Sequence, residues 1–164
     1  MIKRLLCVGG IFMCVGLSTA IAGPLHDAAS QGNTQQAAGL LDQGAVIEEH
    51  DDSGDTALIL AALGGYADTV RLLLDRGADI RGRNAHGLTA LHAAAEENHK
   101  DVVEILLAHG ADIEAQERNG YTPLSQAGWR DYWDTAAVLM KAGAKCQGAD
   151  MVGDRLYMEC TKRQ

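Results

Sequence analysis

An all-α solenoid, built from about four helix-turn-helix units with projecting loops, is the fold class that the sequence predicts. The first observation is a period of 33 residues, in which Gly54, Gly87 and Gly120 share one frame. The second is composition, since apolar residues make up 47% of the 164 residues but aromatic residues only 4%. Such an interior suits closely packed helices better than a β-sandwich, whose pleated surfaces favour β-branched and aromatic residues. One short repeat cannot bury its own apolar face, so neighbouring repeats must stack.

Residues 1–22 are expected to be a signal peptide that is cleaved after Ala22. Lys3 and Arg4 precede a stretch without charge, and Ala20 and Ala22 place small residues at its end. This order is typical of a secretory signal peptide. Its brevity favours a bacterial envelope, so we expect an exported, periplasmic protein. A retained membrane anchor is the alternative, although the apolar stretch is at the short end for a span.

Repeats are expected over residues 23–145, at about 23–50, 51–83, 84–116 and 117–145. Several further sets of residues keep the frame, which makes a chance period untenable. They are Thr56, Thr89 and Thr122; Leu25, Leu58, Leu91 and Leu124; Leu40, Leu73, Leu106 and Leu139; and Gly44, Gly77, Gly110 and Gly143, each followed by alanine.

Each repeat is expected to hold two short helices and an exposed loop. In the third repeat, Thr89 has a hydroxyl that can cap the first helix. Leu91, Ala94 and Ala95 then fall on one helical face. Asn98 is expected to end that helix, because asparagine tolerates the left-handed conformation. A second apolar helix and a projecting loop complete the unit.

The start of each repeat resembles the Thr-Pro-Leu-His-x-Ala pattern of the ankyrin-repeat family. It reads Thr-Ala-Leu-His-Ala-Ala at 89–94, Thr-Pro-Leu-Ser-Gln-Ala at 122–127 and Thr-Ala-Leu-Ile-Leu-Ala at 56–61. The resemblance covers roughly residues 24–145, extends to small secreted bacterial ankyrin proteins, and implies a scaffold that binds other proteins. Ile59 and Ser125 replace the histidine that His92 provides, so we expect weaker helix-cap networks in those two repeats.

Residues 146–164 are expected to form a short strand-like tail, strapped over the end of the stack by a disulfide. Cys146 and Cys160 are the two cysteines left after signal cleavage. Export places them in an oxidising compartment, where such a pair usually bonds. Closing a loop of about 15 residues would contribute roughly 3 kcal/mol. Two free thiols or a redox-active dithiol are the alternatives, and the missing Cys-x-x-Cys spacing argues against the dithiol.

The motifs that would indicate an enzyme are missing from the sequence, so a non-enzymatic function is expected. It contains no Gly-x-Ser-x-Gly, no Gly-rich phosphate loop and no His-Glu-x-x-His. The net charge of −8 disfavours nucleic acid and anionic membranes, which both select basic surfaces. His50 lies in an acidic stretch that lacks the spacing of a calcium loop. We expect neither a metal nor a cofactor.

A partner protein is expected to bind the concave face, which the ankyrin resemblance places at the loop tips and at the ends of the first helices. The residues so placed are Asp52, Ser53, Asp55, Leu63, His86, Leu88, Glu96, Glu97, Arg118, Asn119, Tyr121, Trp129 and Arg130. The carboxylates of this set suggest an acidic groove and a partner with a basic surface. The chain is expected to be a monomer.

Aromatic residues concentrate in the fourth repeat, which contains both tryptophans of the chain. Because tryptophan, tyrosine and arginine dominate binding hot spots, Tyr121 and Trp129 are expected to anchor the partner. Tyr132 and Trp133 are expected to pack against the C-terminal tail instead. The bound partner would be an envelope enzyme or toxin, which the chain either neutralises or supports.

Overall fold

The computed structural model describes residues 23–146, which form eight α-helices and no strand. In chain order the helices are α1 Pro24–Ser30, α2 Thr34–Asp42, α3 Ala57–Leu63, α4 Ala67–Asp75, α5 Ala90–Glu96, α6 Lys100–Ala108, α7 Pro123–Trp129 and α8 Trp133–Lys141. The expected all-α repeat solenoid is confirmed. The signal peptide at 1–22, and the strand-like tail that contains Cys160, lie outside the described residues and stay predictions.

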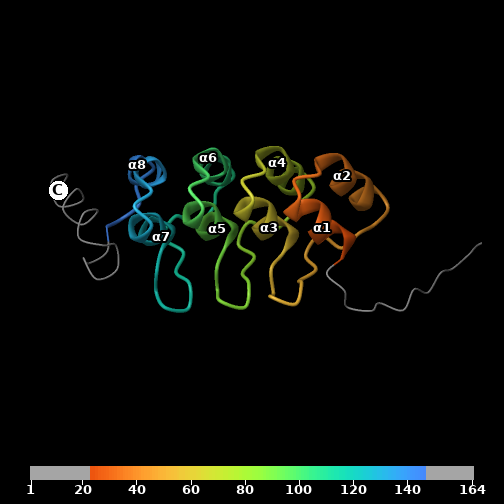
Figure 1. The fold of residues 1–164 in the computed structure, drawn as a ribbon, viewed down its shortest axis with the longest axis horizontal. Helices are drawn as coiled ribbons and strands as arrows, with labels where there is room; N and C mark the ends of the chain where they lie inside the picture. The colour runs from red at the N-terminus through yellow and green to blue at the C-terminus, as the bar shows by residue number, and fades with distance from the viewer. Residues whose placement is uncertain (1–22, 147–164) are drawn as a thin grey trace, which may run out of the picture.

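The helices form two layers (Figure 1). The inner layer contains α1, α3, α5 and α7, each in contact with the next, and the outer layer contains α2, α4, α6 and α8 in the same succession. Three long loops join one repeat to the next and project from the inner layer, on the side away from the outer helices. The second, third and fourth repeats therefore each present one loop tip and one inner helix along the same side of the stack, where the first repeat presents α1.

Leucines and alanines at repeated frame positions build the core between the layers. Leu73, Leu106 and Leu139, one in each outer helix from α4 onward, have no exposed surface. Burial of each such side chain is worth about 1.5–3 kcal/mol. The adjacent alanines Ala94 and Ala95 of α5 are also fully buried, so their small side chains let neighbouring inner helices approach closely. The low aromatic content of the chain therefore reflects a core that is filled mainly by leucine and alanine.

Threonine caps begin the last three inner helices. In the third repeat, the His92 ring accepts the backbone N–H of Thr89 and bonds its hydroxyl, at 3.3 and 2.9 Å. In the second repeat only the Ile59 N–H reaches the hydroxyl of Thr56, at 3.4 Å, and the expected weaker cap is confirmed there.

The same expectation is wrong for the fourth repeat. The Ser125 hydroxyl accepts the Thr122 N–H at 3.2 Å, and the Ser125 N–H donates to the Thr122 hydroxyl at 3.3 Å. This closes a complete capping box. A serine hydroxyl both donates and accepts, so it can replace the imidazole at the cap.

Candidate functional site

All thirteen residues expected to bind a partner are exposed or half-buried. Those in the loops occupy the projecting tips, and those in the helices lie at the C-terminal ends of α3, α5 and α7. The exposed members are Asp52, Ser53, Leu63, His86, Glu97, Arg118, Asn119, Trp129 and Arg130. We call the thirteen residues together the inner surface.

Each loop tip is built around one side-chain acceptor. Asp51 accepts the N–H groups of Ser53 and Asp55, both at 2.8 Å. Asn84 accepts those of His86 and Leu88 at 2.9 and 3.0 Å. These bonds fold each tip into a fixed turn, as short polar side chains commonly do.

Glu117 performs the same role in the last loop. Its carboxylate accepts the N–H groups of Asn119 and Tyr121, at 2.8 and 3.1 Å, and it is 8% exposed. The three turn acceptors are not among the residues expected to bind a partner. Their signal was present, because positions 51, 84 and 117 keep the period of 33 and all hold side-chain oxygens.

Hydrogen bonds also join neighbouring tips. The Asn84 amide donates to the Asp55 carboxylate at 2.8 Å, and the Arg118 N–H donates to the His86 carbonyl at 3.1 Å. Burial raises the pKa of Asp55, and the hydrogen bond from Asn84 opposes that rise. The tips therefore form one connected platform, which reduces the entropy that binding would cost.

Tyr121 and Trp129 meet on the inner surface, as an anchor requires. Their ring centroids lie 6.5 Å apart with the planes at 88°, an edge-to-face pair. Trp129 keeps 54% of its surface exposed despite this contact. The pair holds a large apolar side chain in one orientation and leaves it open to a partner.

An ion pair modifies the expected acidic groove. Arg130 donates to Glu96 across the third and fourth repeats at 2.6 Å. This hydrogen bond and the charge of Glu96 raise the pKa of Arg130. The charge of Glu96 is therefore offset within the chain, whereas Asp52 and Glu97 remain exposed.

Two other aromatic residues are directed inward. Tyr132 and Trp133 pack against the hydrophobic core from the start of α8. Their expected contact with the C-terminal tail falls outside the described residues.

The buried His92 ring contacts the backbone of Tyr121, one of the residues of the inner surface. Its Nε2 faces the carbonyl of Tyr121 at 3.1 Å, so the ring joins α5 to the loop that carries the aromatic pair. The ring is fully buried. Burial lowers its pKa, because a charged imidazole would lose its hydration.

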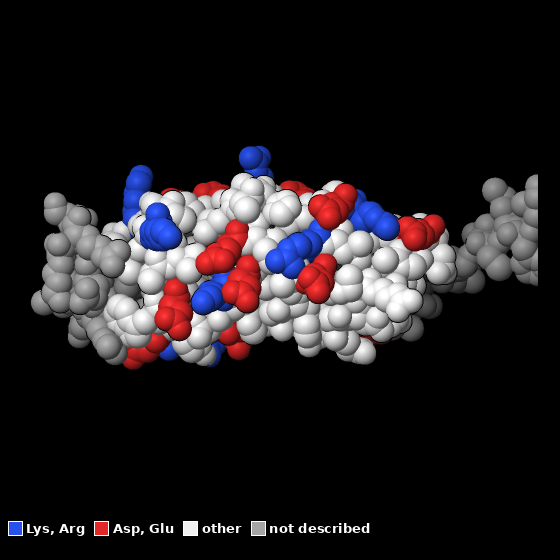
Figure 2. Space-filling model, turned by 90° about the horizontal axis from the view of Figure 1, so that it is seen from above, with Lys and Arg blue, Asp and Glu red and all other residues white. Residues whose placement is uncertain are grey.

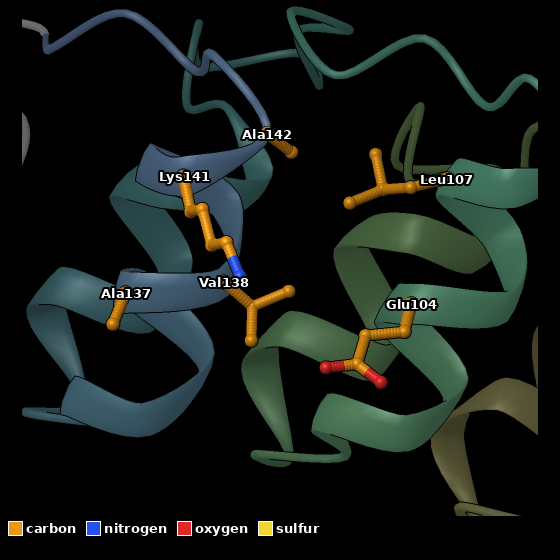
Figure 3. Close-up of a pocket in the computed structure, with 6 residues that line it drawn as sticks. All are labelled: Glu104, Leu107, Ala137, Val138, Lys141 and Ala142. Atoms are coloured by element: carbon orange, nitrogen blue, oxygen red, sulfur yellow. The ribbon is translucent and has the colours of Figure 1, made fainter.

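A shallow groove of about 450 Å³ lies on the outer layer, between α6 and α8. Figure 3 shows Leu107 and Val138 facing each other there, with Glu104 and Lys141 also at its edge. Acidic and basic side chains are interspersed over this outer face (Figure 2), and Arg71–Asp68 and Arg76–Asp42 pair at 2.9 and 2.7 Å. Over residues 23–146 the face therefore presents no single-sign patch of the kind that phosphate backbones select.

Between residues 23 and 146, no grouping of three or more His, Cys, Asp or Glu side chains is suited to a metal ion. Over the same residues, no helix has the length and apolar character needed to cross a membrane.

A stack of paired helices with ordered loop tips and an exposed aromatic side chain defines a protein-protein interaction module. The family description "Ankyrin repeats (3 copies)" matches residues 25–117 and 81–150, so the chain belongs to the ankyrin-repeat family. This fold is typically a non-enzymatic scaffold that binds other proteins. A search of the curated proteins found no match.

Proposed function

We propose that this chain is an exported, monomeric ankyrin-repeat module that binds a protein of the bacterial cell envelope through its inner surface. The observation that carries the proposal is the exposed Trp129, held by Tyr121 and flanked by Arg130. These three residue types dominate binding hot spots, and a fixed aromatic loses little entropy on binding. Export itself rests on the expected signal peptide at residues 1–22.

The carboxylates of Asp52 and Glu97 favour a partner with a basic surface, since both are exposed on the side that carries Trp129. Charges placed in this way steer encounter more than they add affinity. We therefore expect salt to slow association with the partner more than it accelerates dissociation.

The test is crosslinking of a tagged copy in its own host, followed by binding measurements on the purified partner. Trp129→Ala should weaken binding by more than about 2 kcal/mol while leaving the melting temperature nearly unchanged. Lys141→Ala, at the outer groove, is the matched exposed control and should bind like the unaltered protein. Equal loss in both variants, or in neither, would place the partner elsewhere on the molecule.

Assays of the captured partner with and without this protein then separate the two modes of action. A neutralising module lowers the activity of the partner in proportion to complex formed. A supporting module raises its activity or prolongs its lifetime under heat or oxidative stress.

A further inference from the structure

The first repeat contains a buried polar atom without a hydrogen-bond partner, whereas the equivalent atom in the third repeat has its hydrogen bonds. His26 stands at the frame position of His92, is 2% exposed, and its Nε2 lies 2.9 Å from the Glu49 carbonyl. A ring nitrogen facing a carbonyl must carry the proton, and in the tautomer with the proton on Nε2 the other nitrogen, Nδ1, is an acceptor. That Nδ1 is buried and has no hydrogen-bond partner. A buried acceptor left in this condition is costly.

The third repeat shows what is missing. There the Nδ1 of His92 has two partners, the backbone N–H and the hydroxyl of Thr89. Gly23 occupies the frame position of Thr89 in the first repeat and lacks the hydroxyl. As the residue before α1 it also makes no side-chain cap.

Gly23 nevertheless lies close to the unsatisfied nitrogen. A Cβ placed on Gly23 would be 3.6 Å from Nδ1 of His26 and 3.1 Å from Oε2 of Glu49. An acceptor nitrogen and a carboxylate oxygen therefore face the backbone of one residue, which is buried itself. A buried acceptor that lacks a donor, next to the exposed carboxylate of Glu49, suits a group with several N–H bonds.

We propose that this place receives the α-amino group that signal cleavage after Ala22 creates on Gly23, an inference that rests on the export proposed above. While Ala22 is attached, Gly23 has one N–H in a direction fixed by its φ of −65°. A free amino group has up to three N–H bonds and turns about the N–Cα bond. It donates one hydrogen bond to Nδ1 of His26 and directs another at Glu49. Cleavage thus completes the N-terminal cap of the stack.

The positive charge of the amino group affects how well it fits at the N-terminus of α1. A cation at the start of α1 is opposed by the partial positive charge of a helix N-terminus. The carboxylate of Glu49 offsets this opposition, so Glu49→Gln should weaken the capture without removing the acceptor on His26. A Cβ at Gly23 would displace the carboxylate of the exposed Glu49 side chain by only a few tenths of an ångström, so a side chain can be tested at this position.

The experiment compares three forms of the mature chain: one starting at Gly23, the same form acetylated on its amino group, and one starting two residues earlier, at Ile21. The first should melt at least about 3 °C above the other two, because each of these lacks the free amine at Gly23. Gly23→Thr supplies a hydroxyl like that of Thr89, so acetylation of that variant should cost less than about 1 °C. Equal melting of the three unsubstituted forms overturns the proposal.

Amine reactivity gives a second readout that folding stability alone would not change. In the form starting at Gly23, the folded protein should acetylate at its amino terminus at least ten-fold more slowly than the unfolded protein. The form starting at Ile21 should show no such protection, and Glu49→Gln should reduce the protection in the Gly23 form. Equal reactivity of the Gly23 amine in the folded and unfolded protein overturns the inference.

Sequencing the amino terminus of the native protein separates this inference from the proposed export. A native start other than Gly23 contradicts the cleavage and removes the inference with it. A native start at Gly23 with an unprotected amine contradicts the capture alone.

Discussion

Two glycines of the loops illustrate how a residue's surroundings decide its importance. Gly54 and Gly77 both have positive φ, at 79° and 90°. A Cβ on Gly54 would lie 2.8 Å from the backbone nitrogen of Ala85, in the next loop tip, whereas a Cβ on Gly77 meets nothing within 4 Å. Gly54 is required both by its positive φ and by the close approach of the next loop tip, whereas Gly77 is required only by its positive φ.

Gly54→Ala should therefore lower the free energy of unfolding by at least about 2 kcal/mol, and Gly77→Ala by about 1 kcal/mol. Urea denaturation of the two variants measures the difference. Equal losses would mean that neighbouring tips move apart at little cost, contrary to the hydrogen bonds that join them.

His92 makes stability depend on pH. Its pKa is lowered by burial, so the unfolded chain binds the proton more readily than the folded chain. The contribution of His92 to the free energy of unfolding is fully present above the ordinary histidine pKa of about 6.5. It is lost as the pH falls through the lowered pKa of the folded state, by at most about 1.4 kcal/mol per pH unit.

His92→Ser should flatten the loss of stability between pH 7.5 and pH 5.5, even though it lowers stability at both. Serine is the residue that already completes the cap of the fourth repeat. Thermal melting at the two pH values measures the slope. An unchanged slope would assign the acid sensitivity to other groups.

The projecting loops form one ordered unit, because side-chain and backbone hydrogen bonds join each tip to the next. Asn84 is central to this order, since its oxygen accepts two N–H groups of its own tip while its nitrogen donates to Asp55 of the preceding one. One side chain thus fixes a loop internally and fixes its position relative to a neighbour.

Asn84→Asp separates the two roles. It keeps the acceptor, removes the donor and places a second carboxylate beside Asp55, whose pKa is already raised. It should cost about 1–2 kcal/mol at pH 7 and less near pH 4, where one of the two carboxyls is protonated. Asn84→Ala, the control, should be destabilising at both pH values. An Asn84→Asp variant as stable at pH 7 as the unaltered protein would contradict the link between the tips.

At the scale of the whole molecule, stability adds up from repeats and the interfaces between neighbours, so each open end matters. Cys146 ends the described residues, where it packs against the core after Ala144. Its pairing with Cys160 remains a prediction.

Cys146→Ser should lower the melting temperature of the protein purified under oxidising conditions, through loss of roughly 3 kcal/mol of loop constraint. In reducing buffer the variant and the unaltered protein should melt alike. Thiol titration of the unfolded protein supplies the control, with no reactive thiol expected before reduction. An equal melting temperature under oxidising conditions would contradict the strap.

Much of the architecture could be predicted from the sequence by itself. The period of 33, the Gly-Ala pairs and the threonine caps determined the fold class and the paired helices, and the ankyrin resemblance implied that loop tips and first helices share one side. These signals are local, because helix periodicity, caps and left-handed turns depend on residues a few positions apart. Exposure of the thirteen candidate residues follows from the same frame.

Only the tertiary structure decided which of those side chains meet. The pairing of Glu96 with Arg130, the edge-to-face contact of Tyr121 with Trp129 and the bond from Asn84 to Asp55 all depend on how adjacent repeats and loops are placed. So does the unsatisfied nitrogen of His26. Side-chain contacts require ångström precision between segments that a repeat pattern places only approximately. The sequence determined a stack whose loop tips lie on one side, and packing between repeats determined the chemistry that this side presents.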